Sequence, residues 1–147
     1  DADGKPVDGV GSNMGHALGT GLLTPEEARL VVRRLMRPDL LRDFGIATLS
    51  RDNPAYNPVG YHTGSVWTHD TAIAMLGMAK EGFHDEAREA ARRLLRLATA
   101  TRYRFPELCG GEPVGNAPVP YPASCRPQGW AAASAAALLT VLGQLDD

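Results

Sequence analysis

The chain has few of the residues that build metal centres. Its 147 residues include only two cysteines, Cys109 and Cys125, which form no CxxC pair. Two of the histidines, His62 and His69, lie seven residues apart, and there is no HExxH pattern. Zinc sites normally show one of these spacings. We therefore expect no metal and no cofactor, and we expect both thiols to be buried and reduced.

The chain also lacks an excess of positive charge. Fifteen lysines and arginines stand against 17 aspartates and glutamates, for a net charge of −2. Its basic residues are scattered rather than gathered in one cluster. Nucleic-acid-binding domains usually carry a basic patch. Nucleic acid is therefore excluded as an expected partner.

No hydrophobic run is long enough for a membrane. The longest, over residues 130–142, is rich in alanine, whereas a membrane-spanning helix needs about 20 apolar residues. There is no signal peptide and no N-x-S/T sequon. These absences predict a cytoplasmic protein without a membrane partner.

The length of the chain fits one domain. It opens with DADGKPVDG, without an initiator methionine. This opening indicates that residues 1–147 are a segment of a larger protein.

Helical signals dominate the pattern. Thr24, Pro25 and Glu27 predict the start of a helix that Pro38 ends. Apolar spacing predicts further helices over 66–80, from a cap at Asp85 to 101, and over 128–142, with a weaker one over 14–23. Residues 38–64 and 103–127 are rich in proline and glycine and are expected to be irregular, apart from a brief extended piece at 46–49. We therefore predict an all-α fold of helical hairpins with long loops at one end.

Aromatic and polar residues gather in three places: residues 12–16, 56–70 and 105–130. A sugar has an apolar C–H face and hydroxyl edges, so it needs flat rings beside hydrogen-bonding groups. The second and third segments offer both kinds of side chain, in Tyr61, His62, Trp67, His69, Asp70, Tyr121, Gln128 and Trp130. Alternatively, the two tryptophans are core residues near helix ends.

Two acidic residues stand out. Glu107 follows Pro106 in the loop RFPELCGG, and a carboxylate in a rigid, apolar-walled loop suits a general base. Alternatively, it is an exposed loop glutamate. Asp70 either faces a pocket or caps a helix that begins at Thr71. In the first case, Ser65 or Thr68 would be the cap.

Five motifs occur in one order along the chain. They are SNMGH, GIATLS, YNPVGYHTGSVWTHD, FPEL and PYPASCRPQGWAA, at 12–16, 45–50, 56–70, 105–108 and 120–132. Together they resemble the C-terminal part of bacterial amylo-α-1,6-glucosidase and glycogen-debranching-type proteins, over nearly the whole chain. The resemblance implies a partial (α/α)₆ toroid of helical hairpins, with residues 1–147 as the C-terminal segment of one catalytic domain.

The resemblance further implies hydrolysis of α-glucosidic bonds in an oligo- or polysaccharide, with inversion. Such chemistry uses a carboxylic acid and a carboxylate base about 6.5–9.5 Å apart. By motif, Glu107 resembles the base. The implied sugar-binding residues are Tyr61, His62, Trp67, His69, Asp70, Gln128 and Trp130.

The chain departs from the family pattern in several ways. The acid is expected in a Trp-Gly-Arg-Asp type motif, which does not occur here. We therefore expect the segment alone to be incomplete and inactive, with the rest of the catalytic domain as its partner. Gly19, Ala47 and Thr68 stand where the family usually has tryptophan, arginine and proline. These changes leave open a second interpretation: a non-catalytic carbohydrate-binding or regulatory remnant.

Overall fold

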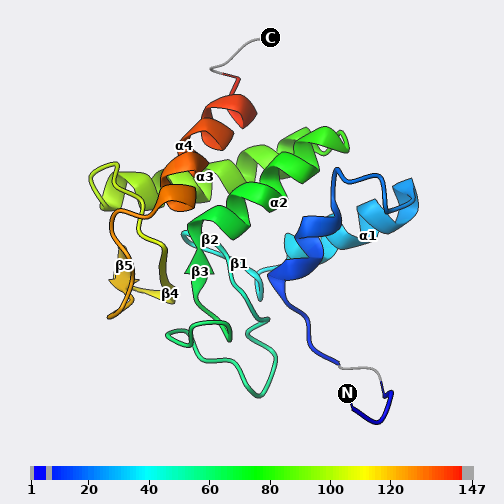
Figure 1. Cartoon of the computed structure of the whole chain (residues 1–147), viewed down its shortest axis with the longest axis horizontal. Helices are drawn as coiled ribbons and strands as arrows, with labels where there is room; N and C mark the ends of the chain where they lie inside the picture. The colour runs from blue at the N-terminus through cyan, green and yellow to red at the C-terminus, as the bar shows by residue number, and fades with distance from the viewer. Residues whose placement is uncertain (1, 6–7, 144–147) are drawn as a thin grey trace.

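The computed structural model describes residues 2–5 and 8–143 of the chain. Figure 1 shows helices in the upper part of the molecule and strands and long loops in the lower part. The helical elements are the 3₁₀-helix η1 (Ser12–Ala17) and the α-helices α1 (Pro25–Leu35), α2 (Thr68–Lys80), α3 (His84–Ala100) and α4 (Gly129–Val141). The strands are β1 (Leu41–Arg42), β2 (Gly45–Ile46), β3 (Val66–Trp67), β4 (Leu108–Val114) and β5 (Ala117–Pro120).

The predicted all-α fold, a partial (α/α)₆ toroid, is wrong. Two small antiparallel sheets accompany the helices, one formed by β1 and β2 and the other by β3, β4 and β5 in that order. The second sheet pairs Val66 with Cys109 and Trp67 with Leu108. The fold is therefore a mixture of helices and strands.

Glycine explains why the second sheet was missed. In β4, a Cβ atom on Gly111 would lie 2.0 Å from the carbonyl oxygen of Gly64, so only glycine allows these backbones to approach each other. Residues 103–127 look irregular because they are rich in glycine and proline, which are depleted in strands. Here glycine permits the packing that places β4.

Helix α1 begins as predicted. The Thr24 side chain accepts a hydrogen bond from the Glu27 amide, and the Glu27 carboxylate accepts one from the Thr24 amide. Other boundaries differ. Phe83 is the N-cap of α3, so the predicted cap at Asp85 is wrong. The predicted helix over 14–23 is replaced by η1, and residues 66–67 form β3 before α2 begins.

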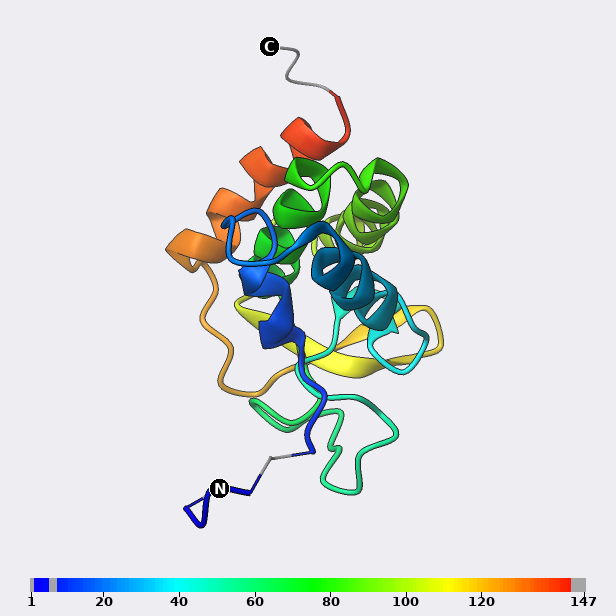
Figure 2. The ribbon, with the colours of Figure 1, turned by 90° about the vertical axis from the view of Figure 1, so that its right-hand side faces the viewer.

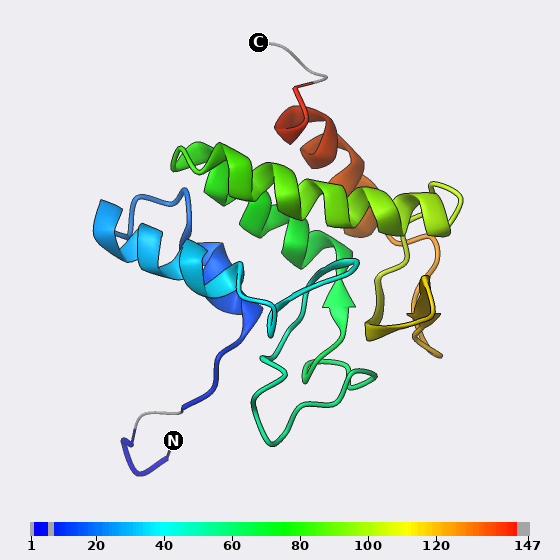
Figure 3. The ribbon, with the colours of Figure 1, turned by 180° about the vertical axis from the view of Figure 1, so that it is seen from behind.

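Helix α2 is the centre of the helical layer. It contacts α3, α4 and η1, and Figure 1 shows α4 on one side of it with η1 and α1 on the other. Figure 2, seen from the side of α1, shows η1 and α1 in front of α2. Figure 3 shows α3 running along the back of α2. The core between these two helices includes Met75, Met78, Leu94 and Leu97, all fully buried. This packing fixes α2, whose N-terminal end meets the second sheet.

Candidate active site

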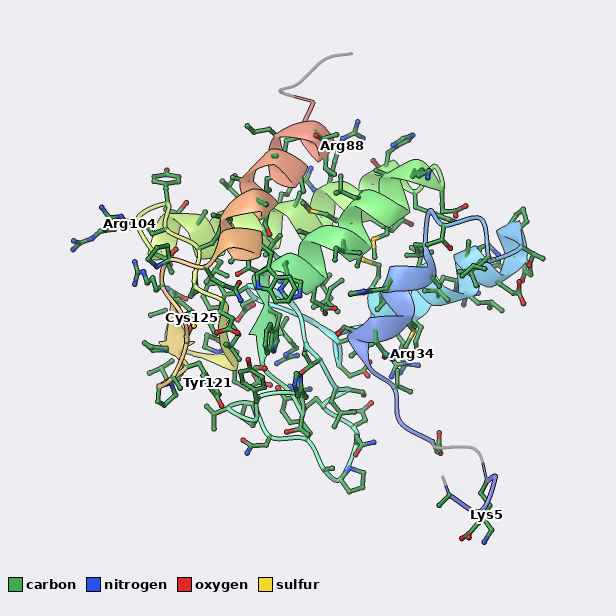
Figure 4. All side chains as sticks on the ribbon, in the orientation of Figure 1. Lys5, Arg34, Arg88, Arg104, Tyr121 and Cys125 are labelled. Atoms are coloured by element: carbon green, nitrogen blue, oxygen red, sulfur yellow. The ribbon has the colours of Figure 1, made fainter. Side chains whose placement is uncertain are left out.

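A cavity of about 410 Å³ lies at the N-terminal end of α2. Figure 4 shows side chains crowded at this end of the helix, with Tyr121 and Cys125 labelled beside β4 and β5. The structure brings seven of the eight predicted site residues to this cavity. Its lining residues are Thr48, Tyr61, His62, Trp67, His69, Asp70, Glu107 and Trp130.

The backbone around Glu107 is held from both sides. Its carbonyl oxygen accepts a hydrogen bond from the Thr68 amide at 3.2 Å, and its own amide donates to the carbonyl of Cys125 at 3.1 Å. The Thr68 hydroxyl also donates to the carbonyl of Pro106 at 2.7 Å. The start of α2 and the loop before α4 thus fix the position of Glu107.

The carboxyl group of Glu107 is fixed as well. One oxygen accepts a hydrogen bond from the Tyr61 hydroxyl at 2.9 Å, and the other accepts one from the Cys125 amide at 3.0 Å. Glu107 is only 7% exposed, so the alternative of an exposed loop glutamate is wrong. Because an ionised carboxylate has about four lone-pair sites, each oxygen can still accept another hydrogen bond.

These hydrogen bonds also set the charge of the group. The Cys125 amide and the Tyr61 hydroxyl stabilise the ionised form and lower the pKa of Glu107 below its ordinary value. The same contact raises the pKa of Tyr61, so its hydroxyl stays protonated and remains a donor. Glu107 is therefore a buried, ionised proton acceptor facing a cavity.

Aromatic rings form the walls of the cavity. Tyr61 lies edge-on to Trp67, with their centroids 4.6 Å apart, and His62 stacks on Trp67 at 5.5 Å. His69 stacks on Trp130 at 4.4 Å. The alternative of two core tryptophans fails for Trp130, which is 58% exposed, whereas Trp67 is buried and still lines the cavity.

His69 contributes a largely apolar ring. Burial lowers the pKa of this histidine, which favours the neutral form. Its Nδ1 atom is buried and has no hydrogen-bond partner among the described residues. A buried polar atom without a partner costs about 1–3 kcal/mol, and unpaired atoms of this kind are often found where a ligand binds.

Asp70 is held by a residue that was not predicted for the site. Its carboxyl group contacts the ring of His16, with 2.6 Å between Oδ1 and Nε2. This hydrogen bond raises the pKa of His16. Asp70 does not cap α2. The N-cap is Trp67, which makes no side-chain cap, so the alternative caps at Ser65 and Thr68 are also wrong.

Gln128 does not line the cavity. Its side-chain oxygen accepts a hydrogen bond from the Ala131 amide at 3.3 Å, as the N-cap of α4. Sequence reasoning missed His16 and Thr48. The motif SNMGH did mark the first as part of a polar cluster, but only the packing of η1 against α2 shows its partner.

The three departures from the family pattern lie in different places. Gly19 lies at the far end of α2, where its amide donates to Glu81, so an aromatic residue there would not border the cavity. Ala47 is fully buried and forms a bridge with Val66. Thr68 supports the Glu107 segment through two hydrogen bonds, including one from a backbone amide that proline lacks.

Other site chemistries receive no support. Residues 2–5 and 8–143 contain no group of three or more His, Cys, Asp or Glu side chains that could hold a metal ion. Both cysteines are free, but only Cys109 is buried. The expectation of two buried thiols is therefore wrong for Cys125, which is exposed.

Within residues 2–5 and 8–143, no helix has both the length and the apolar character to span a membrane.

Comparison with known proteins gives the family. The family described as mannosylglycerate hydrolase MGH1-like glycoside hydrolase domain matches residues 2–109, a range that includes Glu107 and Asp70 but not Trp130. The match is to this family and not specifically to the amylo-α-1,6-glucosidases. No curated protein matches the chain. Since the family match spans well over half of the sequence, the chain belongs to the MGH1-like glycoside hydrolase family.

Proposed function

We propose that Glu107 is the general base of an inverting glycoside hydrolase. The observation that carries this proposal is a buried, ionised carboxylate with two fixed oxygens beside an aromatic-walled cavity. A water bound to Glu107 attacks the anomeric carbon while its proton passes to the carboxylate. The glycosidic oxygen leaves from the opposite face of the sugar and must be protonated there.

The acid that supplies this second proton lies outside residues 1–147 in our proposal. Among the described residues, the only other acidic side chain lining the cavity is Asp70. Asp70 is already bound to His16 and sits at the buried start of α2. The remainder of the catalytic domain is thus the proposed partner of this segment.

The lining of the cavity favours a neutral sugar. Within the part of the chain that the structure describes, it includes two acidic residues, Glu107 and Asp70, but neither lysine nor arginine. Together with the debranching-type motifs of the sequence, this composition supports an α-glucosidic bond in an oligo- or polysaccharide as the substrate. The rings of Tyr61, Trp67 and Trp130 would contact the C–H faces of the sugar.

The description of the family favours a second candidate. A mannosylglycerate-type substrate is a mannoside whose leaving group carries a carboxylate, which the acidic lining would repel. The third interpretation is the carbohydrate-binding remnant, which would bind sugar without hydrolysing it.

The test uses a substrate that does not need the missing acid. Fluoride leaves without protonation, so α-glucosyl fluoride requires only the general base. We expect the 147-residue chain to hydrolyse it slowly to β-glucose, as detected by NMR, and not to hydrolyse isomaltose. Glu107→Gln is expected to lower the rate by about 10²–10⁴-fold.

Glu112→Gln is the matched control, because Glu112 pairs with Arg42 and Tyr56 outside the cavity and its loss should leave turnover unchanged. Near-normal turnover by Glu107→Gln would remove Glu107 from the role of base. Faster hydrolysis of α-mannosyl fluoride than of the glucosyl compound would favour the second candidate. Sugar binding without any fluoride hydrolysis would favour the remnant.

A further inference from the structure

A groove of about 760 Å³ lies between α3 and α4, separate from the aromatic cavity. Most of the residues that line it are apolar, and none of those that the structure describes is acidic. From α4 they include Ala132, Ala135 and Leu139, which lie three and four positions apart and so follow one side of the helix. Leu95 and Ala98 form the wall on α3. A groove between two helices with this lining suits the apolar face of a third helix.

The surface of α4 also differs from that of α3. Gly129–Val141 contains no charged residue, although Trp130 and Leu139 are exposed. On α3, exposed arginines pair with acidic residues of the same helix, as Arg92 does with Glu89. A helix that is apolar on all sides is normally covered by other parts of a protein. We therefore expect a further element to cover α4.

Two arginines give the groove a positive charge. Arg104 and Arg126 line it where α3 ends and α4 begins, and the Arg126 side chain donates a hydrogen bond to the carbonyl of Thr101 at 2.8 Å. Neither forms an ion pair with a residue that the structure describes. Figure 4 shows Arg104 projecting outward from the molecule. A partner with carboxylates beside its apolar face would complement this charge. A second copy of the same groove would instead oppose arginine to arginine.

The turn before Arg104 is strained. Arg102 and Tyr103 have φ angles of 55° and 59°, in the left-handed region that residues other than glycine rarely adopt. Tyr103 is 74% exposed and lines the groove. Backbone strain of this kind is concentrated at functional sites, and tyrosine is enriched in protein interfaces. The strained turn thus adds an aromatic ring to a surface that is suited to a protein partner.

The groove and the cavity are built from the same two segments of the chain. Phe105 lines the groove, and Glu107, two residues later, lines the cavity. Arg126 follows Cys125, whose amide donates a hydrogen bond to the Glu107 carboxylate, and α4 begins with Trp130 in the cavity wall. An element seated in the groove would therefore lie beside the segments that hold the base.

We propose that the groove between α3 and α4 is the docking surface for an amphipathic helix of the remainder of the catalytic domain. The apolar face of that helix packs between Leu95 and Leu139, and carboxylates at its edge pair with Arg104 and Arg126. This inference rests on the proposed function, which places the acid in the remainder. It adds the surface on which the remainder docks and the chemistry of the helix that docks there.

Binding of two designed helical peptides to the full chain, measured by fluorescence anisotropy, tests the chemistry of the groove. The peptides share a leucine face, which is flanked by glutamates in one and by lysines in the other. The glutamate peptide is expected to bind at least tenfold more tightly at low salt, and Leu139→Glu should weaken its binding at least tenfold. Arg104→Glu should reduce the preference to less than threefold.

Arg88→Glu is the matched control, because Arg88 pairs with Asp85 and does not line the groove. This variant should keep the full preference for the glutamate peptide. Absence of binding for both peptides, equal affinities, or a preference that survives Arg104→Glu would overturn the docking surface.

A second test compares the 147-residue chain with the protein encoded by the complete reading frame. Leu139→Cys places a thiol in the groove, and peptide mass spectrometry distinguishes its alkylation from that of Cys109 and Cys125. Alkylation at this position is expected to be at least tenfold slower in the complete protein, with both proteins unfolded in urea as the reference. Equal rates in a complete protein that hydrolyses isomaltose or maltose would overturn the docking surface alone. A complete protein that hydrolyses neither sugar would overturn the proposed function, whatever the alkylation rates.

Discussion

The helical layer and the strand-and-loop layer of this protein are held together by different interactions. In the helices, fully buried apolar residues such as Met75 and Leu94 form the core. Around the cavity, single hydrogen bonds between side chains and backbone hold the residues in place. One example is the bond from the Trp67 ring nitrogen to the carbonyl of Tyr61 at 2.7 Å. The strands add fully buried residues such as Ile46 and Val66 to the same core, whereas the side chains that line the cavity are held mainly by hydrogen bonds. The two layers meet at residues 66–70. Substitutions inside the helices should therefore be able to change stability without changing the site.

The largest expected change in stability is in the helical layer. Leu94→Ala removes a fully buried side chain of α3 and leaves a cavity, which should cost about 2–5 kcal/mol of unfolding free energy. Urea unfolding measures this loss. The affinity of the remaining folded protein for isomaltose should not change, because Leu94 does not line the cavity.

The neighbouring residue provides the control for Leu94. Leu95 is 41% exposed, so Leu95→Ala should cost much less. Loss of sugar affinity in folded Leu94→Ala would contradict the separation of the two layers.

Thr68 lies where the layers meet, and its substitution should affect both. Thr68→Val keeps the shape of the side chain but leaves the buried carbonyl of Pro106 without its hydrogen bond. The expected loss is about 1–3 kcal/mol by urea unfolding, with slower fluoride hydrolysis because Glu107 follows Pro106. In Thr99→Val, the matched change at an exposed hydroxyl of α3, both effects should be small. A stability loss without any change in hydrolysis would show that Thr68 does not position the base.

The sequence predicts the two layers unequally. The start of α1 is confirmed because Thr24, Pro25 and Glu27 act locally, within one helical turn. The second sheet was missed because its pairing depends on Gly111 meeting Gly64, which lie far apart along the chain. Local signals of glycine and proline favour loops there, and only the tertiary contact makes a strand.

Prediction of the candidate site from the sequence was limited in the same way, because it gives residue types but not long-range contacts. The types of its residues pointed to a sugar, and seven of the predicted side chains lie at one cavity. The hydrogen-bond partners of these residues could not be predicted from the sequence. The contact of His16 with Asp70 spans 54 positions, and that of Tyr61 with Glu107 spans 46. Gln128 was predicted to bind sugar because it is a polar residue near Trp130, but its side chain caps α4 instead.

A smaller effect, with a defined pH dependence, is expected at Tyr61. Tyr61→Phe removes one of the hydrogen bonds that lower the pKa of Glu107, so that pKa should rise. A lowered carboxyl pKa adds stability above the pKa of the unfolded state, about 4.3, and this contribution disappears as the pH falls through the folded-state pKa. The variant should therefore be less stable than the wild type at pH 7, and the difference should vanish at low pH.

Urea unfolding across this pH range, with NMR titration of the Glu107 side chain, measures both effects. Tyr103→Phe is the control, because Tyr103 is 74% exposed and lies outside the cavity. A stability difference that stays constant at all pH values would mean that Tyr61 acts by packing alone.

The smallest stability changes are expected on the exposed side of α4, where two apolar residues can be compared. Leu139, 44% exposed, lines a groove of about 760 Å³ between α3 and α4, and none of the described residues that line this groove is acidic. Trp130, 58% exposed, lines the smaller cavity with Glu107. Leu139→Gln should change stability by no more than about 0.5 kcal/mol, and Trp130→Ala by about 1 kcal/mol, because its ring stacks on His69. Only Trp130→Ala should weaken isomaltose binding, roughly three- to tenfold, through the loss of ring contact. If Leu139→Gln weakened binding equally, the larger groove rather than the acidic cavity would hold the sugar.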